Sequence, residues 1–170
     1  MKKEILLLLF IFCLFSCKEK YEYDFSNGKT TIQMDGKNMV AEAVGGFESK
    51  SLFSSSFLFR DEIGLLSGHF YIAHIPYPPV NGKYNLSDNG ASNFFTYYAI
   101  VNDDVLLETY KLKPDSVRSV CEITNFNSIN GFISGKINAV FVKDSNSSKN
   151  IKYPDTIVFS NGNFDIRSKY

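Results

Sequence analysis

Histidines, serines and acidic residues, the side chains that most often do chemistry, are sparse or scattered in this 170-residue chain. His69 and His74 are its only histidines, and on a regular strand this spacing points them to opposite faces, about 16 Å apart, unless a bulge intervenes. A zinc ion shared by both is therefore not expected. The stretch 131–135, Gly-Phe-Ile-Ser-Gly, differs from the Gly-x-Ser-x-Gly nucleophile motif. We predict no catalytic residue, no metal, no cofactor and no enzyme activity.

Cysteine is the remaining nucleophile, and the chain has three. Cys13 and Cys17 lie near the N-terminus, so Cys121 is the only thiol beyond that segment. Alternation between residues 117 and 124 puts Cys121 on the same face as Val117 and Ile123. Because free cysteine is among the most often buried residue types, we predict a packed side chain at Cys121 and not a nucleophile.

Aromatic side chains crowd the middle third of the chain and are the candidates for binding. Each ring combines a large apolar body with, in tyrosine, a polar tip that can stack on a sugar or anchor a partner. The prolines of segment 76–80 are expected to turn Tyr77 outward. The predicted binding residues are Tyr77, Tyr84, Phe94 and Tyr97, with a glycan or an envelope protein as partner. Ordinary packing of residues with high strand propensity is the alternative.

The first twenty residues have the pattern of a secretory signal. Lys2 and Lys3 precede an apolar run, 5–15, which at ~1.5 Å per residue covers about half of a ~30 Å hydrocarbon core. The run ends in Leu14-Phe15-Ser16-Cys17, which resembles the lipobox of bacterial lipoproteins. A plain signal peptide that happens to contain a cysteine is the alternative, although Phe15 suits its cleavage site poorly.

The lipobox implies acylation of Cys17, loss of the signal peptide 1–16 and attachment to the membrane through the acyl chains. Residues 17–29 are then a lipidated tether, and residues 30–170 form a single domain. The expected location is the bacterial cell envelope, at the outer membrane, with the periplasmic or surface face left open. Without Lys2, Lys3 and Glu4 the chain has 16 basic and 17 acidic residues, so nucleic acid is not an expected partner.

Period-two alternation and turn residues indicate an all-β domain. Asp35-Gly36 predicts a tight hairpin, Gly45-Gly46 interrupts the alternation, residues 74–79 predict an exposed loop, and Asn161-Gly162 predicts a bulge or bend. The expected strands are 30–34, 37–44, 51–59, 64–75, 83–86, 93–101, 105–112, 117–126, 132–143 and 156–166. Such a set predicts an antiparallel sandwich or flattened barrel of about 8–10 strands, preceded by a signal-peptide helix.

Several turn and strand motifs resemble those of small Bacteroidetes lipoproteins of unknown function. They are 32–37 (IQMDGK), 82–86 (GKYNL), 122–126 (EITNF) with 129–136 (INGFISGK), and 157–166 (IVFSNGNFDI). The resemblance implies an all-β domain behind a lipobox, and it supplies no catalytic residues. We expect a lipid-anchored envelope protein whose β domain binds a ligand or partner without catalysis. The alternatives are a lipocalin-like carrier of a small apolar ligand and, less favoured, a hydrolase.

Overall fold

The computed structural model describes residues 27–86, 95–113, 117–144 and 152–167, and these residues form ten strands. Within them no helix is long and apolar enough to cross a membrane. The predicted signal peptide 1–16, Cys17 and most of the tether lie outside the described residues. The strands are β1 (Gly28–Met34), β2 (Lys37–Ser49), β3 (Leu52–Arg60), β4 (Leu66–Pro76), β5 (Gly82–Asn85), β6 (Phe95–Asn102), β7 (Val105–Leu112), β8 (Val120–Asn127), β9 (Phe132–Lys143) and β10 (Thr156–Arg167).

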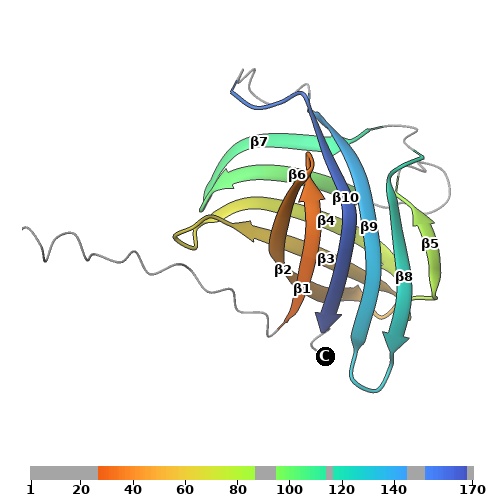
Figure 1. The fold of residues 1–170 in the computed structure, drawn as a ribbon. Helices are drawn as coiled ribbons and strands as arrows, with labels where there is room; N and C mark the ends of the chain where they lie inside the picture. The colour runs from red at the N-terminus through yellow and green to blue at the C-terminus, as the bar shows by residue number, and fades with distance from the viewer. Residues whose placement is uncertain (1–26, 87–94, 114–116, 145–151, 168–170) are drawn as a thin grey trace, which may run out of the picture.

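All ten strands belong to one antiparallel sheet that curls back on itself. The order is β10-β1-β2-β3-β4-β6-β7-β9-β8-β5, and β10 also pairs with β9. Eight strands thereby close a ring, and Figure 1 shows β8 and β5 continuing beyond β9. The result is a flattened barrel and not a regular one, because β7 meets β9 over three residue pairs only. The predicted all-β fold is confirmed.

Local turn chemistry places the strand boundaries close to the predicted ones. Asp35 and Gly36 have φ angles of 49° and 79°, as a hairpin with two left-handed residues requires. The Asp35 side chain accepts a hydrogen bond from the Val158 N–H (2.8 Å), which ties this turn to β10. Asn161 has φ 53°, and the pairing of β10 shifts register between Phe159 and Gly162. The predicted hairpin and the predicted bulge are both confirmed.

The expectation that Gly45-Gly46 interrupts a strand is wrong. β2 continues through both residues to Ser49 and stays paired with β3. A Cβ on Gly45 would lie 2.4 Å from a ring carbon of Phe53 and 2.6 Å from a methyl carbon of Ile166. The first glycine is therefore required by close packing against the core and not by a break in the backbone.

Aromatic rings fill the interior of the barrel. Phe159 lies at their centre, with ring centroids 5.0 Å from Tyr98, 5.1 Å from Phe70, 5.8 Å from Phe59 and 5.9 Å from Phe141. All five side chains are at most 3% exposed. These distances are those of direct ring contact. The space in which a lipocalin-like carrier would hold its ligand is thus occupied here by side chains.

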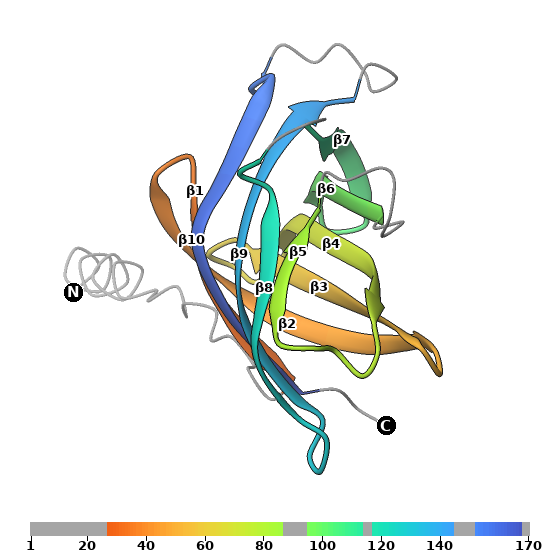
Figure 2. The same ribbon diagram turned by 90° about the vertical axis from the view of Figure 1, so that its right-hand side faces the viewer.

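The sheet divides along one edge of β9. Residues 132–138 of β9 pair with β8, whereas residues 141–143 pair with β7. Between them the backbone of Val140 bonds to loop residues: its N–H donates to Ser119 Oγ (3.1 Å) and its carbonyl accepts from the Lys113 N–H (2.8 Å). Figure 2 shows β8 and β5 in front of β9, and β7 beside the C-terminal end of β9.

Candidate functional site

Two of the predicted binding residues, Tyr77 and Tyr84, pack against the core. The Tyr77 ring lies between Phe47 and Phe126, with centroids 4.5 and 5.6 Å away, so the prediction that the prolines turn it outward is wrong. The free energy gained by packing the apolar ring exceeds the tendency of the neighbouring prolines to keep this segment exposed. The Tyr84 hydroxyl donates to the Val80 carbonyl (2.7 Å) and accepts from the Val80 N–H (3.1 Å). Both tyrosines order the segment between β4 and β5.

Tyr97, by contrast, lies on the outer face of the sheet, and Phe94 falls outside the described residues. Alternation along β6 turns Tyr98 into the core and leaves Tyr97 and Phe95 outside. Phe95 is 56% exposed, which is unusual for so large an apolar side chain. The structure therefore separates Tyr97 from Tyr77 and Tyr84, which do not form one site with it.

A bulge in β4 overturns the expectation that the two histidines face opposite sides. Between the pairs Phe53–Ile75 and Ser55–Ile72 the strand gains one residue, and His74 takes φ 63°. His69 then lies outside with Tyr71, and His74 reaches the same face. The sequence contains a sign of this bulge. Ile72 and Ile75 are three residues apart, so on a regular strand they would face opposite sides, yet both isoleucines are buried.

The outer aromatic patch consists of His69, Tyr71, Phe95 and Tyr97, on β4 and β6. Tyr71 and Tyr97 are direct cross-strand partners with ring centroids 5.4 Å apart. Tyr97 also contacts His69 at 5.5 Å and Phe95 at 5.7 Å, and His69 contacts Tyr71 at 5.8 Å. Four rings from two neighbouring strands thus form one continuous surface on the outside of the barrel.

Hydrogen bonds fix the polar edges of this patch. His69 shares bonds with Ser56 Oγ through Nε2 (3.0 Å) and with the Tyr97 hydroxyl through Nδ1 (3.3 Å). Burial lowers the pKa of His69, so its ring stays neutral at pH 7. Burial, and then the neighbouring Tyr71, raise the pKa of Tyr97. Tyr97 therefore keeps its hydroxyl proton.

A carboxylate lies at the end of the patch. The Tyr71 hydroxyl donates to Glu48 Oε1 (3.3 Å), and His74 Nε2 is 3.5 Å from Glu48 Oε2. These groups combine a hydrogen-bond acceptor with ring faces, a composition suited to a hydroxyl-rich ligand.

Ser56 and His69 together resemble two of the three residues of a catalytic triad, but their surroundings differ from those of a triad. Ser56 lies in the middle of β3, where it pairs with Val44 of β2 on one side and with Tyr71 of β4 on the other. An oxyanion hole needs backbone N–H groups that point at the reacting carbonyl, whereas N–H groups in ladders bond to neighbouring strands. The geometry suits binding better than acyl transfer.

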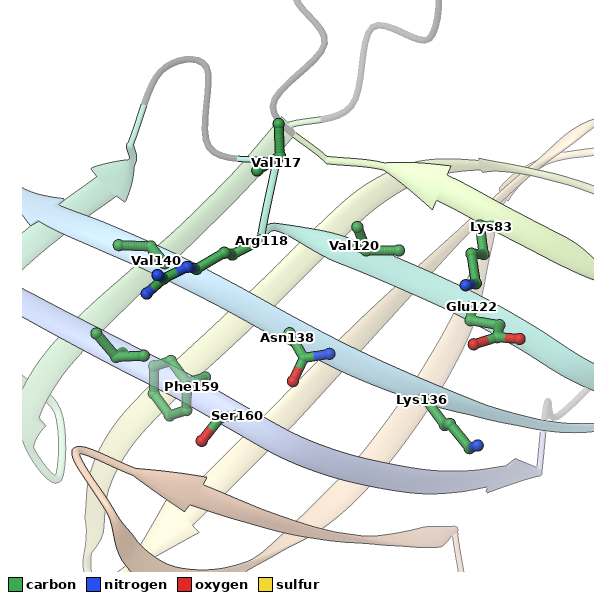
Figure 3. Close-up of a pocket in the computed structure, with 11 residues that line it drawn as sticks. Lys83, Val117, Arg118, Val120, Glu122, Lys136, Asn138, Val140, Phe159 and Ser160 are labelled. Atoms are coloured by element: carbon green, nitrogen blue, oxygen red, sulfur yellow. The ribbon is translucent and has the colours of Figure 1, made fainter.

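A second feature, the outer pocket, lies on a different part of the surface, where β9 divides. It has a volume of about 420 Å³ and faces outward from β5, β8, β9 and β10. Figure 3 shows three cationic side chains around it, together with an acid and several valines. Its charged members are Lys83, Arg118, Glu122 and Lys136. None of these four residues is among the binding residues predicted from the sequence, although Lys136 falls on the polar face of the clearest alternating strand.

Cys121 is buried as predicted. It is 1% exposed, and burial and then the neighbouring Glu122 raise the pKa of its thiol to about 12. Ile123 faces the same side, but Val117 precedes the strand and is 86% exposed, so its predicted place on that face is wrong. Among the described residues no group of three or more His, Cys, Asp and Glu side chains could hold a metal ion.

Comparison of the chain with protein-family models, with curated proteins and with solved structures finds no match.

Proposed function

We propose that this chain is a lipid-anchored protein of the bacterial envelope, and that its β domain binds a glycan, without catalysis, through the outer aromatic patch. The observation that carries the proposal is the set of four contacting rings on the outer face of β4 and β6, of which Phe95 is exposed and the other three are half-buried. Ring faces carry partial negative charge and attract the partly positive C–H groups of a sugar ring. Tyrosine hydroxyls and the Glu48 carboxylate lie beside these faces and suit sugar hydroxyls.

The filled interior and the packed positions of Tyr77 and Tyr84 support the outer surface as the binding face. A ligand on the patch needs no opening of the barrel, because Phe95 and Tyr97 already lie outside the core. The patch is also held rigidly: its strands are paired with neighbours on both edges. Such preorganisation reduces the entropy lost on binding.

The test is binding of the full chain to an oligosaccharide array, followed by titration of the strongest ligands. We expect Tyr97→Ala to weaken the Kd about 30-fold, since loss of a binding hot spot costs about 2 kcal/mol. Phe95→Ala should weaken it as well. Tyr153→Ala, a half-buried tyrosine outside the patch, is the matched control and should leave the Kd unchanged. Equal binding by Tyr97→Ala and the unaltered chain would refute the site.

The anchor is tested separately, by labelling cells with a fatty acid analogue and following the protein into the detergent phase. We expect the label on the unaltered chain and its loss in Cys17→Ser. Cys121→Ser is the control, because that thiol is buried and should carry no acyl group. Retention of the label in Cys17→Ser would refute the lipoprotein assignment without bearing on the glycan site.

A further inference from the structure

The outer pocket combines a valine floor with a cationic rim. Val120, Val140 and Val158 come from β8, β9 and β10 and line it. Val140 and Val158 are direct partners in the pairing of β9 with β10, so two of these side chains are adjacent. A volume of about 420 Å³ is within the range of small-molecule sites, about 300–1,000 Å³. The floor offers an apolar contact on the outside of the sheet.

The backbone that carries Arg118 is fixed by the next residue. Ser119 is fully buried, and its Oγ accepts the Val140 N–H (3.1 Å) while its carbonyl accepts the Leu86 N–H (2.9 Å). These two bonds fasten the start of β8 where the sheet divides. Figure 3 shows the Arg118 side chain extending across β9 beside Val140. The guanidinium thus lies at the edge of the valine floor.

The charges around the pocket do not balance. Lys83 pairs in register with Glu122, which pairs in turn with Lys136, so these three form a ladder across β5, β8 and β9. Within the described part of the chain no carboxylate lies within ion-pair distance of Arg118. Three cations and one acid leave two positive charges at the pocket. An anionic ligand would satisfy them.

We infer that the outer pocket binds a small organic anion with an apolar body, of the class of medium-chain carboxylates. The valine floor would take the apolar chain, and the Arg118 guanidinium, which lies beside Val140, would take the carboxylate. This inference goes beyond the proposed function, because it concerns a second ligand on strands that share no residue with the outer aromatic patch. The arginine fork matches the two oxygens of a carboxylate, which favours that group over a single negative point charge.

Calorimetric titration of the full chain with octanoate tests the inference. We expect saturable binding, and binding of 1-octanol or octylammonium at least about tenfold weaker, since they keep the chain but lack the negative charge. Inorganic phosphate, which keeps the charge but lacks the chain, should also bind at least about tenfold more weakly. Equal affinity for octanoate and 1-octanol would overturn the inference.

Two variants and one control assign the binding to the pocket. Arg118→Gln should weaken octanoate binding about tenfold, because it removes a charged hydrogen-bond donor. Val158→Ser should weaken it about fivefold by removing apolar floor. Lys37→Gln removes an exposed charge in the β1–β2 hairpin, outside the pocket, and should change nothing. An unaltered Kd in Arg118→Gln would overturn the assignment.

The same titrations separate this pocket from the glycan site and from a membrane surface. Tyr97→Ala should bind octanoate normally, so failure of either site is visible independently of the other. Cosedimentation with phosphatidylglycerol vesicles, lost in Arg118→Gln and unaccompanied by octanoate binding, would assign the cations to a lipid surface and overturn the inference.

Discussion

Two adjacent glycines in β2 should respond oppositely to the same substitution, alanine. A Cβ on Gly45 meets Phe53 and Ile166, which are 1% and 0% exposed, at 2.4 and 2.6 Å. Ordinary carbon contacts need about 3.5–4.0 Å, so these neighbours would have to retreat by about 1 Å into a close-packed core. The Phe53 ring is held from another side by Phe47, at a centroid distance of 6.0 Å. Overpacking of this kind costs about 1–3 kcal/mol.

Gly46 is the matched control, since a Cβ there meets nothing within 4 Å. Both substitutions lower the conformational entropy of the unfolded chain equally, a gain of about 0.4–1 kcal/mol. That gain cancels when the two variants are compared, so the difference isolates the steric cost. We expect Gly46→Ala to be slightly more stable than the unaltered chain and Gly45→Ala to be about 1–3 kcal/mol less stable than Gly46→Ala.

Urea unfolding followed by circular dichroism measures this difference, and thermal unfolding provides a second readout. A loss of 1–3 kcal/mol corresponds to a Tm difference of about 2–12 °C for a domain of this size. Equal midpoints for the two variants would show that the core can accommodate a methyl group at Gly45. The reasoning that this glycine is dictated by close packing would then be refuted.

Three further predictions concern the β1–β2 hairpin, the buried thiol and the patch histidine. Asp35→Ala removes the acceptor for the Val158 N–H and should cost about 0.5–1.5 kcal/mol in urea unfolding, whereas Asp35→Asn should keep most of it. The peptide carrying Cys121 should resist iodoacetamide in the folded protein and react after unfolding, as mass spectrometry would show. The lowered pKa of His69 means that the unfolded chain binds more protons just below pH 6.5. Stability should therefore decrease as the pH falls below that value, and His69→Gln should make this decrease smaller.

The local part of the fold follows from the sequence. Alternation along residues 132–143 predicts β9 and its inward face, and Asp35-Gly36 predicts the first hairpin, because both signals lie within a few consecutive residues. Closure of the ring through β10 and β1 is not local. It depends on which strand edges meet after more than a hundred intervening residues, and period-two alternation carries no information about that partner.

The candidate sites were harder to predict because they depend on register between strands. The many aromatic residues near Tyr97 in the sequence identify it as a candidate, but its partner Tyr71 follows only from the pairing of β4 with β6. Arg118 and Lys83 meet the same pocket only because the sheet divides at β9. Only the position of Glu122 beside Lys136 could be predicted from the sequence, because a short turn joins β8 and β9 into a hairpin.

The β4 bulge shows how one extra residue changes the composition of an outer surface. On a regular strand His74 would follow Phe70 and Ile72 into the phenylalanine core, and Ile75 would face water. Burying an imidazole there without a hydrogen-bond partner would cost several kcal/mol, about 2–7 by transfer measurements. The inserted residue avoids this cost: Ile75 is 3% exposed, and His74 lies against Glu48 on the outer face. The bulge that buries Ile75 in the core therefore also places His74 at the polar end of the aromatic patch.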